Sequence, residues 1–265
     1  MFEELLEDVA QRNGLRETST WVKLAAGFSA IVLCLLATGY VAPLIIAAIL
    51  AGAILLLARI DPRTYAELFL LPLWFALLSA AVIILISGGA HVLWSWDPLP
   101  FLHLSITRES INTGFFVLCR VIGGMSALLF IALTIPMTDL FAVMRRCRMP
   151  DVVIDLSMII YRTIFFLLDQ VRQIHQAQVM RLGYSGWKES VHTFAMLCGA
   201  AFIASWDAGD DLVRAMDARC YDGKFALLGE SRPAGARSLA ALSLFLIAGS
   251  AVVIATQGIT LLPVA

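Results

Sequence analysis

An uncharged stretch over residues 24–58 constrains the fold of this chain more than any other feature of its sequence. As a single helix, its 35 residues would be about 52 Å long, whereas the hydrocarbon core of a bilayer is about 30 Å thick. The stretch therefore predicts two membrane-spanning helices, at about 21–39 and 42–58. Gly39 and Pro43 mark the predicted break, because glycine tolerates turn geometry and proline lacks a backbone donor.

The composition agrees with a membrane protein. Hydrophobic residues make up 60% of the chain and charged residues only 15%, whereas charged residues are about 25% of a typical soluble domain. The net charge of −1 offers no surplus of basic side chains to neutralise phosphates, so nucleic-acid binding is set aside. We therefore expect an integral membrane protein that contacts the lipid bilayer and no nucleic acid.

Three further apolar runs are long enough to cross a membrane, at about 68–87, 111–135 and 238–259. The segment 91–109, between the third and fourth spans, is rich in aromatic residues and is predicted to be irregular and to lie at the outer interface. The sequence thus predicts an all-α, polytopic membrane protein with about five transmembrane helices.

The distribution of charge predicts how these helices are oriented. Cations cluster where residues 138–237 join the fourth and fifth spans, so the positive-inside rule places this region and the N-terminus in the cytoplasm and the C-terminus outside. The first 20 residues are acidic, unlike a secretory leader, and their apolar spacing predicts an amphipathic surface helix. The predicted domains are this N-terminal segment (1–20), four spans (21–137), a cytoplasmic module (138–237), and the last span with a short outer tail (238–265).

The cytoplasmic module is predicted to be helical. Its two apolar stretches, Met158–Leu168 and Val191–Trp206, contain 11 and 16 residues and are too short to cross, since a span needs about 20. They are expected to lie at or just inside the membrane interface. Two polar, arginine-bearing segments, Tyr161–Gly186 and Ser205–Gly223, are expected to form helices on either side of the second apolar stretch.

Each polar segment carries an arginine near its C-terminal end. Arg181 is followed by Gly183 and Gly186, which are expected to stop the first helix. The second helix is expected to open with the carboxylates of residues 207–211 in its first turn, where they suit the positive helix end, and to close after Arg219.

An arginine at a helix end has two interpretations. It can donate two hydrogen bonds to carboxylates or carbonyls of a partner protein. It can also serve only as a partner of the helix dipole or as an anchor that reaches toward the interface. The occurrence of a similar phrase at both helix ends favours docking.

The two phrases resemble a known pair of signatures. Residues 180–186 (Met-Arg-Leu-Gly-Tyr-Ser-Gly) and 218–223 (Ala-Arg-Cys-Tyr-Asp-Gly) are similar to the paired Ala-Arg-Gly motifs of the transmembrane T components of energy-coupling-factor transporters. Over nearly its full length the chain most resembles the cobalt-transport members, the CbiQ proteins. It departs from the usual motif at Met180 and Leu182, in place of alanine and glycine, and at Cys220, in place of glycine.

The resemblance implies a non-catalytic scaffold in a bacterial inner membrane that couples ATP hydrolysis to cobalt(II) uptake. Its partners would be two ATP-binding-cassette ATPases, one on each arginine, and a membrane-embedded S component that binds the metal. ATP and magnesium would be bound by the ATPases, with no cofactor or metal held by this chain. The residues that the resemblance assigns to docking are Arg181, Arg219, Tyr184, Tyr221, Gly183, Gly186, Gly223 and Ala218.

Two alternatives remain at this point. The first is the same T-component role for nickel or a vitamin, because no substrate pocket is visible in the sequence. The second is a membrane prenyltransferase, in which the carboxylates of residues 207–211 would bind magnesium and a diphosphate. That chemistry needs a second acidic set, for which Asp151 and Asp155 are the only candidates.

Two further arginines are candidate contacts with a partner subunit. Arg120 lies inside the fourth predicted span, where a charge is costly and usually paired. Contact with a partner or a buried carboxylate and extension toward the outer interface are equally compatible with its position. Gly123 and Gly124 beside it would permit close helix approach, within the chain or with a partner. Arg214, in the second polar segment, is the other candidate.

Overall fold

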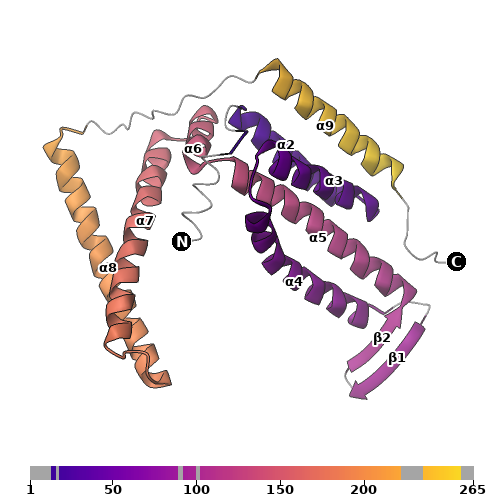
Figure 1. Cartoon of the computed structure of the whole chain (residues 1–265), viewed down its shortest axis with the longest axis horizontal. Helices are drawn as coiled ribbons and strands as arrows, with labels where there is room; N and C mark the ends of the chain where they lie inside the picture. Colours follow the sequence, from indigo (N-terminus) through magenta and orange to yellow (C-terminus); the bar gives the residue numbers. More distant parts are fainter. Residues whose placement is uncertain (1–12, 16–17, 89–91, 100–101, 222–234, 258–265) are drawn as a thin grey trace. The chain divides into compact units, whose positions relative to one another are not determined.

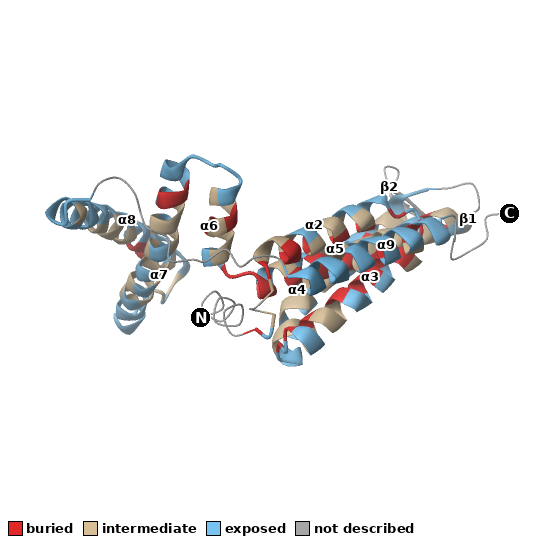
Figure 2. Cartoon of the chain, turned by 90° about the horizontal axis from the view of Figure 1, so that it is seen from above, coloured by how far each residue is buried: buried red, intermediate tan, exposed pale blue. Residues whose placement is uncertain are grey.

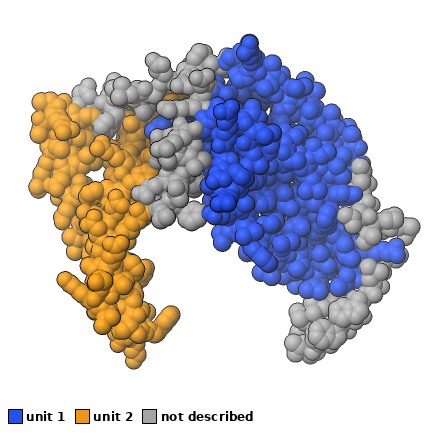
Figure 3. Space-filling view, viewed as in Figure 1, with its two compact units in different colours: residues 1–140, 230–265 blue, residues 141–229 orange. Residues whose placement is uncertain are grey.

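The computed structural model describes residues 13–15, 18–88, 92–99, 102–221 and 235–257 (Figure 1). The chain forms two compact units (Figure 3). Unit 1 comprises residues 1–140 and 230–265, and unit 2 comprises residues 141–229. The predicted amphipathic helix at the N-terminus lies outside the described residues.

Unit 1 contains the five predicted spans. The break predicted near residue 40 is confirmed, since one helix ends at Leu36, the next begins at Val41, and Pro43 lies in the first turn of the second, where a missing N–H is tolerated. Three of the helices have the length and composition of membrane spans, and the first two are shorter apolar helices. The elements are α2 (Thr20–Leu36), α3 (Val41–Gly52) with the π-helix η1 (Ala53–Leu57), α4 (Pro62–Ile86), α5 (Arg108–Thr134) and α9 (Ala236–Ala255).

Helix α5 is the centre of unit 1 and packs against α2, α3 and α4 (Figure 1). Buried residues are concentrated where α2, α3 and α5 meet (Figure 2). Small residues allow this close approach, as is usual between helices in membranes. A Cβ atom on Gly123 would lie 2.7 Å from Cys34 Sγ and 3.0 Å from Pro43 O, whereas one on Gly124 would meet open space. Of the two possibilities for the glycine pair, Gly123 thus serves helix packing within this chain.

The outward surface of unit 1 is apolar. Along α4, the side chains of Leu71, Trp74, Phe75 and Leu78 are all largely exposed. Exposed apolar side chains on a helix with the length of a span are expected where lipid is the solvent. This agrees with the membrane class that the composition predicts.

A β-hairpin replaces the irregular segment expected between the third and fourth spans. Strand β1 (Val92–Leu99) pairs antiparallel with β2 (Leu102–Thr107), with Trp94 opposite Ile106. The sequence Leu-His-Leu-Ser-Ile-Thr of β2 alternates apolar and polar residues, which is the period of a strand. The aromatic residues of this segment are also compatible with strands, in which such side chains are enriched.

Unit 2 contains two long helices, α7 (Asp151–Met180) and α8 (Trp187–Ala218), which follow the short helix α6 (Met137–Arg146). The expected helix start at Ser205 is wrong, because α8 is continuous through it. Residues 199–208 are rich in alanine and contain no proline, so nothing there stops the helix.

The continuity of α8 also corrects the expectation that this region holds no segment long enough to cross a membrane. Its 32 residues are about 48 Å long, and by length and composition α8 is one of four described helices that could span. Val191–Trp206 is the apolar part of this longer helix, so its 16 residues do not set the length of the segment that could cross.

Candidate functional site

Both signature arginines occupy the same position at a helix end. Arg181 is the C-cap of α7 and Arg219 the C-cap of α8, with nearly equal backbone angles of φ −91°, ψ 13° and φ −100°, ψ 11°. At α7, the N–H of Gly183 donates to Gln178 O at 3.0 Å, and at α8 the N–H of Tyr221 donates to Met216 O at 3.1 Å. This six-residue closure is the Schellman motif, which satisfies carbonyls that the helix leaves free.

The residue after each arginine adopts a left-handed backbone conformation. Leu182 has φ 57° and Cys220 has φ 52°. In a Schellman motif this position usually holds glycine, because other residues adopt the conformation at a cost of roughly 1–2 kcal/mol. The expectation that Gly183 and Gly186 stop α7 is therefore corrected, since Leu182 makes the left-handed turn. This geometry gives a physical reason for a glycine after the arginine in the usual motif.

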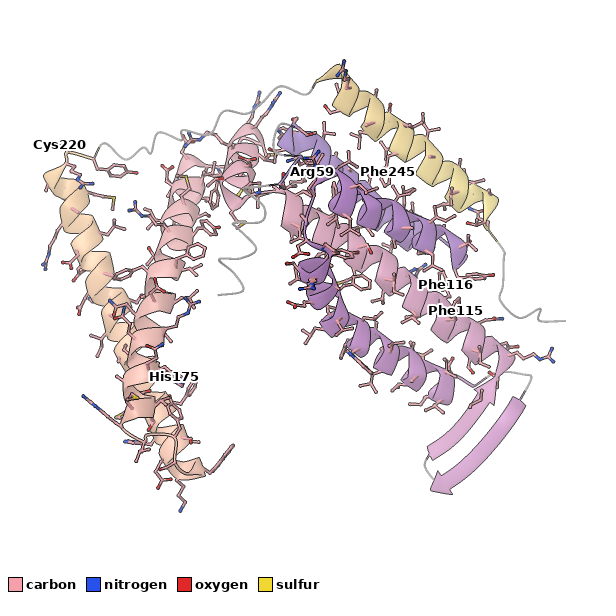
Figure 4. All side chains as sticks on the ribbon, in the orientation of Figure 1. Arg59, Phe115, Phe116, His175, Cys220 and Phe245 are labelled. Carbon is pink, nitrogen blue, oxygen red and sulfur yellow. The ribbon has the colours of Figure 1, made fainter. Side chains whose placement is uncertain are left out.

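The two arginines are exposed and are presented at opposite ends of α8. Figure 4 shows Cys220 at the end of α8 remote from His175, which lies near the other end of the helix pair. Among the described residues, neither guanidinium has an ion-pair partner. The structure does not bring the two signatures into one site; it holds them about 48 Å apart along α8.

A polar network orders the turn that carries the first signature. Tyr184 Oη donates to Gln178 Oε1 at 2.9 Å and lies 3.1 Å from His175 Nδ1. Gln178 Nε2 donates to Thr193 O at 3.1 Å, and Thr193 Oγ1 donates to Gly183 O at 2.8 Å. The network therefore joins the end of α7 to the second turn of α8.

The network gives two predicted docking residues local structural roles. Tyr184 is half-buried and bonded within the chain, so it positions the turn around Arg181. A Cβ atom on Gly183 would lie 2.8 Å from Thr193 Cγ2, so glycine is needed here for close approach. The sequence showed the glycine and the tyrosine but not Gln178 and Thr193, because their contact joins two helices.

The remaining residues of the signatures lie at or beside the helix ends. Gly186 is the N-cap of α8, and Ala218 is its last residue and is exposed. Tyr221 is 37% exposed. Gly223 lies outside the described residues.

The acidic residues behind the prenyltransferase hypothesis do not form a facing pair of clusters in the described part of the chain. Asp207–Asp211 lie in the interior of α8 and not in its first turn. Asp155 is buried and 3.5 Å from Arg145 Nη2, so its carboxylate is engaged in an ion pair. Within the described residues, no group of three His, Cys, Asp or Glu side chains is placed to hold a metal ion.

The guanidinium of Arg120 forms its hydrogen bonds with backbone carbonyls of this chain. Its Nη2 donates to Leu35 O at 3.0 Å and to Ala37 O at 2.8 Å, and its guanidinium carbon lies 4.5 Å from the centroid of Phe116. The arginine of α5 thus binds carbonyls at the C-terminal end of α2, where the helix dipole is negative. Neither a partner carboxylate nor the outer interface is needed to explain this charge.

A second cation makes the reciprocal contact and was missed in the sequence. Lys23, near the start of α2, is buried and its Nζ donates to Thr134 O, the last residue of α5, at 3.2 Å. Asn13 Nδ2 donates to the same carbonyl at 3.1 Å. In the sequence, Lys23 directly precedes the uncharged stretch of residues 24–58. A cation at the start of a predicted span is the feature that could have indicated its role.

Arg214 is engaged only weakly. Its Nη1 lies 3.9 Å from Asp211 Oδ1, one turn earlier on the same helix, and both side chains are largely exposed. Such surface pairs contribute little to stability. Its suggested contact with a partner subunit stays a prediction.

The fold and the two arginine-capped helix ends define a multi-pass, predominantly helical membrane protein whose second unit contains a pair of long helices. Residues 11–228 match the family model of CbiQ, described as cobalt transport protein. The chain belongs to the CbiQ family, whose members are the non-catalytic transmembrane T components of energy-coupling-factor transporters. This confirms the resemblance carried by the two signatures, and the prenyltransferase hypothesis is set aside.

Individual relatives agree with this assignment. The chain is 41% identical over 244 residues to a protein of Methanocorpusculum labreanum named as a fused cobalt transport protein, CbiMQ; the match covers 92% of this chain but 41% of that longer relative. It is 26% identical to the cobalt transport protein CbiQ of Salmonella typhimurium, over 68% of this chain and 80% of the relative. It is 27% identical to the energy-coupling factor transporter transmembrane protein EcfT of Limosilactobacillus fermentum, over 76% and 77%.

Proposed function

We propose that this chain couples ATP hydrolysis to the uptake of cobalt(II) by docking Arg181 and Arg219 on two ATP-binding-cassette ATPases. The observation that carries the proposal is the closely similar capping geometry of the two arginines. Each is exposed, held at a helix C-cap and, among the described residues, free of an ion-pair partner. A guanidinium held in this way can donate two parallel hydrogen bonds to a carboxylate or to backbone carbonyls of a partner.

The separation of the arginines supports one ATPase on each. A single continuous helix joins the two ends, so a movement of one ATPase relative to the other would tilt or displace α8 and the helix packed on it. We propose that this movement is passed to a membrane-embedded S component that holds the substrate. ATP and magnesium are then bound by the ATPases, and this chain contributes positioning and force transmission.

Cobalt is proposed from the names of relatives, among them the CbiMQ protein of Methanocorpusculum labreanum and the CbiQ protein of Salmonella typhimurium. The name of the EcfT relative gives no substrate, so nickel and vitamins stay open as alternative substrates. Reconstitution of the chain with its ATPases and S component is expected to give ATP-dependent uptake of radiolabelled cobalt(II). Uptake of nickel(II) or a vitamin without cobalt would contradict the substrate but leave the coupling role intact.

Docking on cytoplasmic ATPases requires both signatures on one side of the membrane. We propose that this is the cytoplasmic side of a bacterial inner membrane, with the N-terminus also inside and α8 lying at the interface without crossing. The module predicted over residues 138–237 then includes all of unit 2.

This topology predicts a labelling pattern. In a variant that retains Cys220 as its single cysteine, Cys220 is expected to react with a membrane-impermeant maleimide only after the membrane is opened. A second variant, with its single cysteine at position 185 (Ser185→Cys), should behave in the same way. A third, with its single cysteine at position 265 (Ala265→Cys), should react in intact cells. Labelling of positions 185 and 220 from opposite sides would show that α8 crosses, and would exclude docking of both arginines on one side.

A further inference from the structure

A cavity of about 590 Å³ lies between α7 and α8. The helices meet near the turn of residues 181–186 and separate toward the other end (Figure 1). The cavity occupies the separated part, about 12 Å along α7 and about 16 Å along α8. Its lining residues are Met158, Ile159, Arg162, Thr163, Phe166, Ala208, Asp211, Leu212 and Arg219.

Most of the cavity wall is apolar. Met158, Ile159 and Phe166 come from one face of α7, and Ala208 and Leu212 from α8. Phe166 is 49% and Leu212 is 37% exposed, so the wall is accessible from outside. A large accessible apolar wall beside α8, which has the length and composition of a membrane span, is suited to an acyl chain.

The same cavity contains two cations. Arg162 and Arg219 both line it, both are exposed, and neither has an ion-pair partner among the described residues. Its single acid, Asp211, lies 3.9 Å from Arg214 on the surface of α8. The cavity therefore combines an apolar wall with an excess of positive charge, which is the complement of an amphiphile with an anionic group.

We propose that this cavity binds a membrane phospholipid, with its phosphate on the guanidinium of Arg162 and an acyl chain along the apolar wall. Arginine matches phosphate because its planar group donates two parallel hydrogen bonds. Basic pockets beside helices at a membrane surface bind lipid headgroups by this chemistry. This lipid site is separate from ATPase docking, although Arg219, one of the two proposed docking residues, also lines the cavity.

Native mass spectrometry of the purified full-length chain in a neutral detergent tests the proposal. Dioleoyl-phosphatidylglycerol and dioleoyl-phosphatidylethanolamine are added separately, with dioleoylglycerol as the matched lipid that lacks a phosphate. Both phospholipids are expected to bind at least about fivefold more tightly than dioleoylglycerol, the factor that one arginine contributes near a membrane surface. Arg162→Gln should lower phospholipid binding by about the same factor, and Arg162→Lys should lower it less.

Arg172→Gln is the matched control, because Arg172 lies outside the cavity and pairs with Asp169 at 3.2 Å. It should bind phospholipid as the unaltered chain does. If Arg162→Gln cannot be purified folded, Ala208→Trp fills the cavity from the opposite wall and should reduce binding of both phospholipids. Equal binding of dioleoylglycerol, or unchanged phospholipid binding by Arg162→Gln, would overturn the proposal.

A photo-crosslinking amino acid at position 208 identifies the occupant in native membranes. A lipid adduct is the expected product, and a protein adduct in its place would also overturn the proposal. The mass measurement contains no ATPase, so its result is independent of the docking proposal. ATPase capture, measured separately on the same variants, reports on docking alone.

Discussion

Replacing Arg181 or Arg219 by glutamate is expected to leave the chain inserted in the membrane but to weaken capture of the ATPases and abolish cobalt uptake. Each substitution removes a charge-assisted contact and puts a negative charge against the partner's acceptors. Loss of one partner of such a contact costs about 2–5 kcal/mol, so capture should weaken at least about 30-fold. Both arginines are exposed and, within the described part of the chain, neither guanidinium forms an ion pair, so folding should be preserved.

Co-purification of tagged chain with the ATPases measures the effect, and uptake is measured on the same cells. Lys188→Glu is the matched control, since it makes the same charge reversal at an exposed position in the first turn of α8, where a carboxylate is tolerated. The control should retain capture and uptake. The docking proposal fails if the Arg181→Glu, Arg219→Glu double variant co-purifies with the ATPases as well as the unaltered chain does.

Replacing Arg120 by methionine is expected to destabilise unit 1 by about 2–6 kcal/mol. The methionine keeps the apolar stem but leaves the carbonyls of Leu35 and Ala37 without their donor, and each unsatisfied carbonyl in an apolar setting costs about 1–3 kcal/mol. The contact with Phe116 is lost as well. Arg120→Lys should fall in between, because an ammonium group cannot reproduce the planar guanidinium.

Thermal unfolding in detergent, followed by the loss of helical circular dichroism, measures the difference. Arg108→Met is the control, since Arg108 is an exposed residue at the first position of α5. If Arg120→Met unfolds as the control does but no longer captures the S component, Arg120 contacts the partner and its capping role is secondary.

The reciprocal contacts of Arg120 and Lys23 explain how charges are tolerated inside this membrane unit. Helices α2 and α5 are antiparallel. Lys23 of α2 donates to a carbonyl at the C-terminal end of α5, and Arg120 of α5 donates to a carbonyl at the C-terminal end of α2. Both cations therefore replace the water that a membrane cannot supply to the last carbonyls of a helix. We expect this pair of contacts to hold the two helices in register.

Helices α7 and α8 differ in how well the local sequence predicts their boundaries. The arginines, their positions at helix ends and the membrane class were all predicted, because each depends on neighbouring residues or on the length of an apolar run. The start of α8 was not, because the apolar residues before Ser205 and the polar residues after it are successive stretches of one continuous helix. A change of polarity along the chain therefore does not by itself mark the boundary of a helix.

The sequence by itself determined the bilayer as the solvent, the five helices of unit 1 and the two arginine-bearing helix ends. Apolar length and helix-capping patterns are local properties, so no tertiary contact was needed to recognise them. Only the tertiary structure decided that Arg120 caps α2, that Tyr184 is folded into a network with Gln178, and that Arg162 shares a cavity with Arg219. Each of these depends on which residues from separate elements become neighbours, and that is settled only when the helices pack.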